Sequence, residues 1–247
     1  MPLEYRIPDW NRYEMDRRHP LRRFEAVEKE QSVVHDCLES LVEAGILPHS
    51  DYNEEGLIAM QRALEANFEI PWTAITPRMQ RLLYAINCIS KPGVMIGVGI
   101  FCGYTFISNA GAAIGPGSCY RAEKLIGIEI DPDEASRARR NVSSLAGTDG
   151  FRIVAADGVT WLREFNDDID LLYLDANGGG SKGKAIYLDI LRSALRCLHP
   201  GSLVLAHNSF NSAQKLEGYL KYVRSKDNFR QSLNAVIDDQ GLEVSLR

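Results

Sequence analysis

Three short motifs combine tight turns and acidic side chains in a way that suits a nucleoside ligand. The run GVGIFCGYT (97–105) is rich in glycine, which lets the backbone turn tightly and approach a ligand without a Cβ in the way. Glu129 ends an apolar run, and a carboxylate there can accept hydrogen bonds from two adjacent ribose hydroxyls. Asp157 follows another apolar run, where an acceptor can meet an adenine amino group. Together the motifs predict a site for a nucleoside-containing cofactor.

These motifs follow apolar segments that must act as strands to bring them together. Apolar runs separated by helical stretches predict a parallel sheet covered on both faces, with strands over 94–99, 125–130, 151–155, 170–174 and 202–206. Because ligands bind at the carboxyl ends of the strands in open α/β sheets, the three motifs should meet at one edge.

The chain before the first strand has helical spacing instead. Apolar residues predict three helices, over 24–45, 53–67 and 78–90. Thr76 and Pro77 mark the start of the last one, since proline at the first helical position loses no useful donor. We therefore expect a helical cap over residues 1–72 and a cofactor-binding domain over residues 73–247.

The end of the chain departs from the parallel pattern. Residues 238–241 (DDQG) join two predicted strands, 229–237 and 242–246, as a hairpin turn. A terminal hairpin does not fit the two-halved sheet of NAD(P)-binding proteins. The spacing GxGxxxG at 97–103, in place of GxGxxG, also disfavours NAD(P).

Composition narrows the class of protein further. The 247 residues are 45% hydrophobic and have a net charge of −5, which argues against a nucleic-acid partner. The five cysteines include no CxxC pair, which disfavours a zinc site or a disulfide framework. No apolar segment is typical of a signal peptide or a membrane span, so we expect a cytoplasmic protein with no membrane contact.

The order and spacing of GVGIFCGYT, GIEID (127–131), AADG (155–158) and LLYLDA (171–176) resemble class I S-adenosylmethionine (SAM)-dependent methyltransferases. The likeness is greatest to the small-molecule O-methyltransferases of the catechol and caffeoyl-CoA type and covers about residues 73–247. It implies an α/β, Rossmann-like sheet of seven mostly parallel strands with a C-terminal antiparallel hairpin. It also implies a SAM cofactor, a small-molecule substrate and, by analogy with relatives, a homodimer.

The resemblance also implies how SAM is held. Glu129 would bind the ribose, Ile130 would pack on the adenine, and Ile75 would contact the amino-acid end of the cofactor. The other residues expected at the cofactor are Gly97, Gly99, Phe101, Tyr104, Thr105, Asp157, Gly158 and Asp175.

Catechol-type relatives bind magnesium through an Asp after the fourth strand and an Asp-Asn pair after the fifth. The corresponding residues here are Asp175, His207 and Asn208. Imidazole suits zinc, iron or nickel better than magnesium. The site is therefore either tuned to a softer ion or metal-free, and we favour the metal-free interpretation. His207 would then act as a catalytic base or orient the substrate.

Lys184 and Tyr187 match a Lys-x-x-Tyr pattern that supplies a general base in the family, which makes Lys184 and Asp175 candidate catalytic residues. The segment NGGGSKG (177–183) separates the two and looks like an insertion. It is either a loop that closes over the substrate or a surface loop on which Lys184 is solvated.

Gly97 stands where the family normally has a glutamate that fixes the ammonium group of SAM. Its absence leaves open an enzyme that cyclises SAM, to azetidine-2-carboxylate and methylthioadenosine, or transfers the aminocarboxypropyl arm. A non-catalytic SAM-binding protein is a third alternative. The leading hypothesis is a transferase that moves the SAM methyl group to a small molecule, with an oxygen acceptor favoured by the resemblance.

Overall fold

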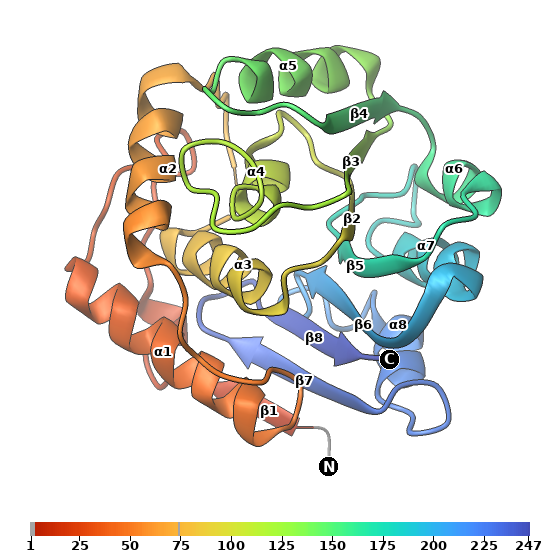
Figure 1. Ribbon diagram of the computed structural model, residues 1–247. Helices are drawn as coiled ribbons and strands as arrows, with labels where there is room; N and C mark the ends of the chain where they lie inside the picture. Colours follow the sequence, from red (N-terminus) through yellow and green to blue (C-terminus); the bar gives the residue numbers. More distant parts are fainter. Residues whose placement is uncertain (1–2, 74) are drawn as a thin grey trace.

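A computed structural model describes residues 3–73 and 75–247 and, within them, one sheet of eight strands in the order β1-β7-β8-β6-β5-β2-β3-β4 (Figure 1). The strands are β1 (Leu3–Arg6), β2 (Val94–Val98), β3 (Lys124–Glu129), β4 (Phe151–Ala155), β5 (Ile169–Leu174), β6 (Leu198–His207), β7 (Gln231–Val236) and β8 (Leu242–Leu246). The predicted mostly parallel α/β sheet with a C-terminal hairpin is confirmed.

Strands β2 to β6 run parallel, and β8 lies antiparallel between β6 and β7. Besides the seven predicted strands, the sheet contains one strand that the sequence did not predict. Strand β1 pairs in parallel with β7, placing Leu3 opposite Leu233 and Arg6 opposite Val236. The N-terminal segment thereby extends the sheet at its edge.

Helices cover both faces of the sheet (Figure 1). They are α1 (Val27–Glu43), α2 (Glu54–Asn67), α3 (Pro77–Ser90), α4 (Tyr104–Ala110), α5 (Pro132–Ser143), α6 (Gly158–Glu164), α7 (Ile186–Ala194) and α8 (Glu217–Val223). Short 3-10 helices lie at Trp10–Arg12 and Leu195–Cys197. Residues of α1 to α5 share one apolar core, and residues of α6 to α8 share a second core. No helix in the described parts of the chain is long and apolar enough to cross a bilayer.

The three predicted N-terminal helices form close to their expected bounds. Asn53 caps α2 by accepting a hydrogen bond from the Gly56 N–H, and Thr76 caps α3 by accepting one from the Met79 N–H. Pro77 occupies the first turn of α3, as predicted. The extension is therefore helical, and its role as a separate cap over residues 1–72 stays a prediction.

Buried ion pairs attach the N-terminal segment to α3. Arg78 donates to both carboxylate oxygens of Glu25 at 2.8 and 2.6 Å, and to the Ile237 carbonyl at 2.7 Å. Arg81 donates to Glu30 at 2.7 Å, and neither side chain of this second pair is more than 1% exposed. Removing one partner of such a pair leaves a buried charge, so these contacts hold the segment in one arrangement.

A second buried charge lies within the inserted strand. Glu243 of β8 is fully buried, and Arg224 donates to its two oxygens at 2.8 and 2.7 Å. Ser232 of β7 donates to the same carboxylate at 2.7 Å. The register of the hairpin therefore places an acidic side chain where an arginine after α8 can reach it.

We predict that Arg224→Met lowers the free energy of unfolding by about 3 kcal/mol, because it leaves the Glu243 carboxylate buried with only a hydroxyl partner. The exposed Arg230 provides a matched control, and Arg230→Met should change stability by less than about 0.5 kcal/mol. Urea unfolding of both variants measures the difference. Equal losses in the two variants would show that the Arg224–Glu243 pair does not stabilise the hairpin.

Candidate functional site

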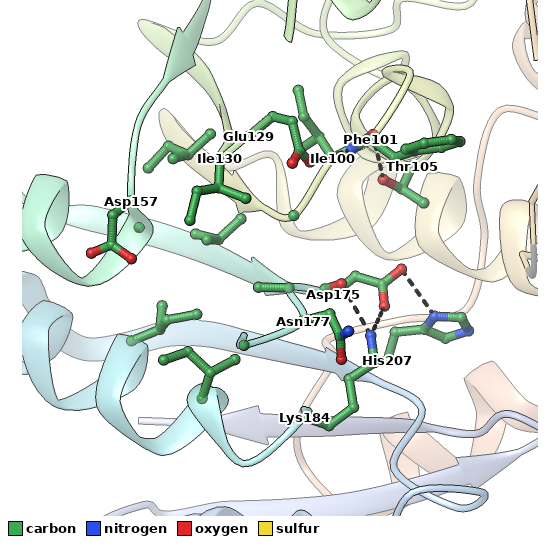
Figure 2. A pocket seen from close by; sticks show the side chains of 18 of the residues that line it. Ile100, Phe101, Thr105, Glu129, Ile130, Asp157, Asp175, Asn177, Lys184 and His207 are labelled. Carbon is green, nitrogen blue, oxygen red and sulfur yellow. Dashed lines mark hydrogen bonds and ion pairs between the residues drawn. The ribbon is translucent and has the colours of Figure 1, made fainter. Parts of the chain in front are cut away.

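The carboxyl ends of β2, β3, β4, β5 and β6 border a cavity of about 580 Å³ (Figure 2). The cavity brings together most of the residues that the sequence predicts at a cofactor. Those that line it are Gly99, Phe101, Tyr104, Thr105, Glu129, Ile130, Asp157, Gly158 and Asp175. The predicted catalytic or metal-binding residues Lys184, His207 and Asn208 line it as well.

Two predicted cofactor residues lie apart from this lining. Ile75 is buried in the core cluster that includes α3. Gly97 lies within β2, where an added Cβ would meet the side chain of Ile100 at 3.2 Å and that of Phe106 at 3.9 Å. In this arrangement, neither residue offers a surface to a ligand in the cavity.

The glycine-rich turn needs glycine at position 99. Gly99 has φ +81°, and an added Cβ would lie 2.4 Å from the backbone nitrogen of Ala176. The turn then places Phe101 so that its N–H donates to Glu129 Oε2 at 2.7 Å. The ends of β2, β3 and β5 are thus fixed to one another by a close backbone approach and a hydrogen bond.

Glu129 presents an oriented carboxylate at the cavity. Its Oε1 accepts from the Asp131 N–H at 3.1 Å, so each oxygen already has one backbone donor. Each carboxylate oxygen retains a further lone pair for a ligand hydroxyl. The neighbouring Ile130 is 65% exposed, which leaves an apolar surface beside the carboxylate.

Asp157 and Gly158 have structural roles in addition to their place at the cavity. Asp157 caps α6 by accepting a hydrogen bond from the Thr160 N–H at 2.8 Å. A Cβ at Gly158 would lie 2.5 Å from Val98 Cγ1, so glycine allows α6 to pack against β2. Asp157 Oδ1 therefore serves as a helix cap in addition to any contact with a ligand.

Asp175 is the polar centre of the site. Lys184 Nζ donates to its Oδ1 at 2.6 Å and to its backbone carbonyl at 3.0 Å, and His207 Nδ1 lies 3.2 Å from Oδ2 (Figure 2). The hydroxyls of Tyr173 and Tyr187 each lie 3.4 Å from the same carboxylate. Four side chains, from β5, β6, the start of α7 and the loop before it, thus converge on one carboxylate.

Two opposing effects act on the pKa of Asp175. Burial raises it, but the charges and hydrogen bonds of Lys184 and His207 lower it by more and hold it well below its usual range. Asp175 is therefore a carboxylate throughout the physiological range.

The predicted metal ligands are engaged with other partners. The Lys184 ammonium group donates a hydrogen bond to the Asp175 carboxylate. Asn208 Nδ2 donates to Gln240 Oε1 at 2.7 Å. Within residues 3–73 and 75–247, no group of three or more His, Cys, Asp or Glu side chains is arranged to hold a metal ion. A cation at Asp175 would have to displace the Lys184 ammonium.

The segment 177–183 lies beside the cavity and contributes to its lining. Gly178 and Gly183 form an isolated bridge that closes the loop. Lys182 is half exposed and pairs with Asp189, whereas the Lys184 side chain is only 17% exposed. Of the two interpretations of Lys184, the arrangement therefore supports a place within the site.

Sequence reasoning missed Trp72, which is 53% exposed and also lines the cavity. Its ring lies 5.0 Å from that of Phe101, at 44°. The only sequence signal was a tryptophan four residues before the Thr76 cap. The Trp72 ring gives the cavity an apolar, aromatic rim next to the glycine-rich turn.

Comparison with known proteins finds similarity in structure alone. No protein-family model matches the sequence, and no curated protein matches it. The fold is similar to that of the S-adenosylhomocysteine-bound methyltransferase PaMTH1 from Podospora anserina, with a TM-score of 0.62 and 14% identity over 89% of this chain and 96% of that chain.

Two further structures have similar folds. The O-methyltransferase from Bacillus cereus, in complex with S-adenosylhomocysteine, has a TM-score of 0.58 and 14% identity over 90% of this chain and 100% of that chain. The O-methyltransferase TomG from Streptomyces achromogenes, in complex with SAM, has a TM-score of 0.55 and 19% identity over 80% of this chain and 91% of that one. At these identities the similarity establishes the fold.

We predict that Gly99→Ala destabilises the protein by roughly 2 kcal/mol or more, because a Cβ meets the Ala176 backbone and φ is positive. Gly150 is the matched control, since it has φ +88° but nothing within 4 Å of an added Cβ. Gly150→Ala should destabilise the protein only through the strain of positive φ, by about 1 kcal/mol. Chemical denaturation compares the two, and an equal loss would contradict the close approach at Gly99.

We also predict that stability depends on pH through Asp175. Because its folded-state pKa is depressed, its ionisation stabilises the fold fully above the unfolded pKa of about 3.9, and this stabilisation declines as the pH falls below that value. The difference in unfolding free energy between wild type and Asp175→Asn should therefore shrink as the pH falls below about 4. Urea unfolding across this range measures the difference. A gap that does not change with pH would contradict the assignment.

Proposed function

We propose that the cavity binds SAM and that the protein transfers its methyl group to an oxygen of a small-molecule acceptor. The observation on which this rests is the oriented Glu129 carboxylate beside the exposed Ile130 side chain, over the glycine-rich turn. A carboxylate next to an apolar surface is the combination that a ribose and an adenine require. The fold shared with SAM-bound and S-adenosylhomocysteine-bound methyltransferases supports the same ligand.

The residues present fit this cofactor. Glu129 would hold the ribose hydroxyls, Ile130 would cover the adenine, and the turn at Gly99 would receive the methionine part. When bound, SAM supplies an activated methyl group and its own leaving group. The protein therefore has to position the acceptor and favour the deprotonated form of its oxygen.

Lys184 is suited to hold that oxygen. Two hydrogen bonds to Asp175 engage its ammonium group, which has three protons to donate. A third proton is left for the acceptor oxygen, and a nearby positive charge favours the anionic form of a hydroxyl. Asp175 would orient Lys184, and it would fix the His207 ring through Nδ1.

The same contacts support metal-independent transfer. The Lys184 ammonium already provides a positive charge at Asp175, and Gln240 engages the side chain of Asn208. We propose that Lys184 takes the part that a divalent cation has in catechol-type enzymes. A homodimer and the absence of a nucleic-acid partner stay predictions.

Product analysis of the intact protein tests the proposed reaction. Methyl transfer leaves S-adenosylhomocysteine and requires an acceptor, and it should proceed in EDTA without added magnesium. Cyclisation or aminocarboxypropyl transfer leaves methylthioadenosine, because the bond from sulfur to the Cγ of the methionine arm breaks. Methylthioadenosine formed from SAM alone, above the rate without enzyme, would overturn the proposal. No product with a broad acceptor panel, despite SAM binding, would favour a non-catalytic binding protein.

We predict that Glu129→Ala weakens SAM binding at least tenfold, since it removes a charged acceptor for two hydroxyls. The exposed Glu123, just before the other end of β3, is the matched control. Glu123→Ala should leave the affinity unchanged. Titration calorimetry on both folded variants measures the effect, and unchanged affinity in Glu129→Ala would falsify the ribose assignment.

We predict that Lys184→Met slows methyl transfer by about a hundredfold or more while SAM still binds. Lys184→Arg separates two roles, because a guanidinium can donate hydrogen bonds but cannot act as a base. If Lys184 holds the acceptor oxygen as a cation, Lys184→Arg retains much more activity than Lys184→Met. Equal rates for the two variants would instead indicate a general base. Single-turnover rates at saturating SAM provide the comparison.

A further inference from the structure

Two cysteines outside the cavity bring their thiols together. Cys88 in the last turn of α3 and Cys119 in the loop after α4 have their Sγ atoms 3.2 Å apart. Cys88 is buried and Cys119 is exposed, so solvent reaches the pair from one side. The other three cysteines, Cys37, Cys102 and Cys197, are buried.

The backbone on both sides of this pair is fixed. The Cys119 N–H donates to the Ala112 carbonyl at 2.8 Å, and the Tyr84 hydroxyl donates to the Gly117 carbonyl at 2.5 Å. Gly117 also packs tightly, since a Cβ there would lie 2.7 Å from the carbonyl oxygen of Gly56. The loop therefore holds Cys119 against α3 and keeps the two thiols adjacent.

We propose that Cys88 and Cys119 form a dithiol site that reacts with small-molecule disulfides and closes to an intramolecular disulfide. A disulfide bond is about 2.05 Å long, so the sulfur atoms must approach by roughly 1 Å. The site is separate from the SAM cavity, and its chemistry does not depend on the proposed methyl transfer.

The reaction has two steps. The Cys119 thiolate attacks one sulfur of the small disulfide, forms a mixed disulfide, and releases the other half as a thiol. Cys88 then gives up its proton and attacks the Cys119 sulfur, which releases the second half as a thiol. The protein loses two protons and two electrons, and one small disulfide is reduced to two thiols.

The different surroundings of the two cysteines set their order. Burial, with the hydrogen bond to Cys119 adding to it, raises the pKa of the Cys88 thiol to about 12. Cys88 therefore remains a thiol that can donate a hydrogen bond to Cys119, the exposed residue of the pair. Attack begins at Cys119, and Cys88 resolves the mixed disulfide.

Oxidised glutathione, added to the intact protein, provides the test. Remaining thiols are alkylated, and peptide mapping by mass spectrometry should find a Cys88–Cys119 crosslink. Because the crosslink closes a loop between positions 31 apart, the oxidised protein should melt about 5 °C or more higher than the reduced protein. Adducts on Cys119 without a crosslink, or a crosslink between other cysteines, would overturn the proposal.

Serine variants check the order of the two steps. Cys88→Ser should stop at a stable glutathione adduct on Cys119, and Cys119→Ser should take up no glutathione and form no crosslink. Cys197→Ser is the control and should crosslink like the wild type. Circular dichroism confirms that each variant is folded, and alkylation of Cys119 in the wild type provides the same block without a mutation. A crosslink that survives this alkylation would also contradict the proposal.

Discussion

The backbone of Gly99 lies so close to that of Ala176 that no side chain would fit at position 99, and this close approach sets the geometry of the site. It joins the turn after β2 to the segment that follows β5, which begins at Asp175. The Phe101 N–H then reaches across to Glu129 at the end of β3. Three strand ends are therefore located relative to one another before any ligand binds, and a preorganised site loses less entropy when it is filled.

Asp175 organises the chemistry in a comparable way, by serving several partners at once. Lys184 and His207 approach its two carboxylate oxygens, and two tyrosine hydroxyls lie at longer range. A buried carboxylate requires such compensation, because burial opposes its charge. The consequence is that the ammonium group of Lys184 has a fixed place beside the cavity. Replacing any one of these partners would therefore change the interactions that the others make with Asp175.

Much of the fold follows from periodicity and motif order. Apolar runs located the parallel strands, and the Thr76-Pro77 pair located the start of α3. Strand β1 was not predictable, because its four residues pair with β7 through backbone contacts that no local pattern encodes. Glu243 also breaks the apolar pattern of β8, and only the tertiary position of Arg224 explains its burial.

The candidate site was predictable to the extent that it depends on strand ends. Glu129, Asp157 and Asp175 all line the cavity because parallel strands share a carboxyl edge. Contacts between distant side chains were not predictable. The engagement of Asn208 by Gln240, and the place of Trp72 at the rim, depend on how loops far apart in the chain pack together.

The pairing of β1 with β7 has a consequence for how the chain acquires its structure during synthesis. Residues 3–6 are synthesised long before their partners at 233–236. The hydrogen bond from Arg78 to the Ile237 carbonyl likewise cannot form until Ile237 has been synthesised. Contacts of such sequence separation form late, because closing a long loop costs conformational entropy before the contact stabilises it. Strand β1 therefore joins the sheet only after β7 has been made, and the emerging chain keeps that edge open until then.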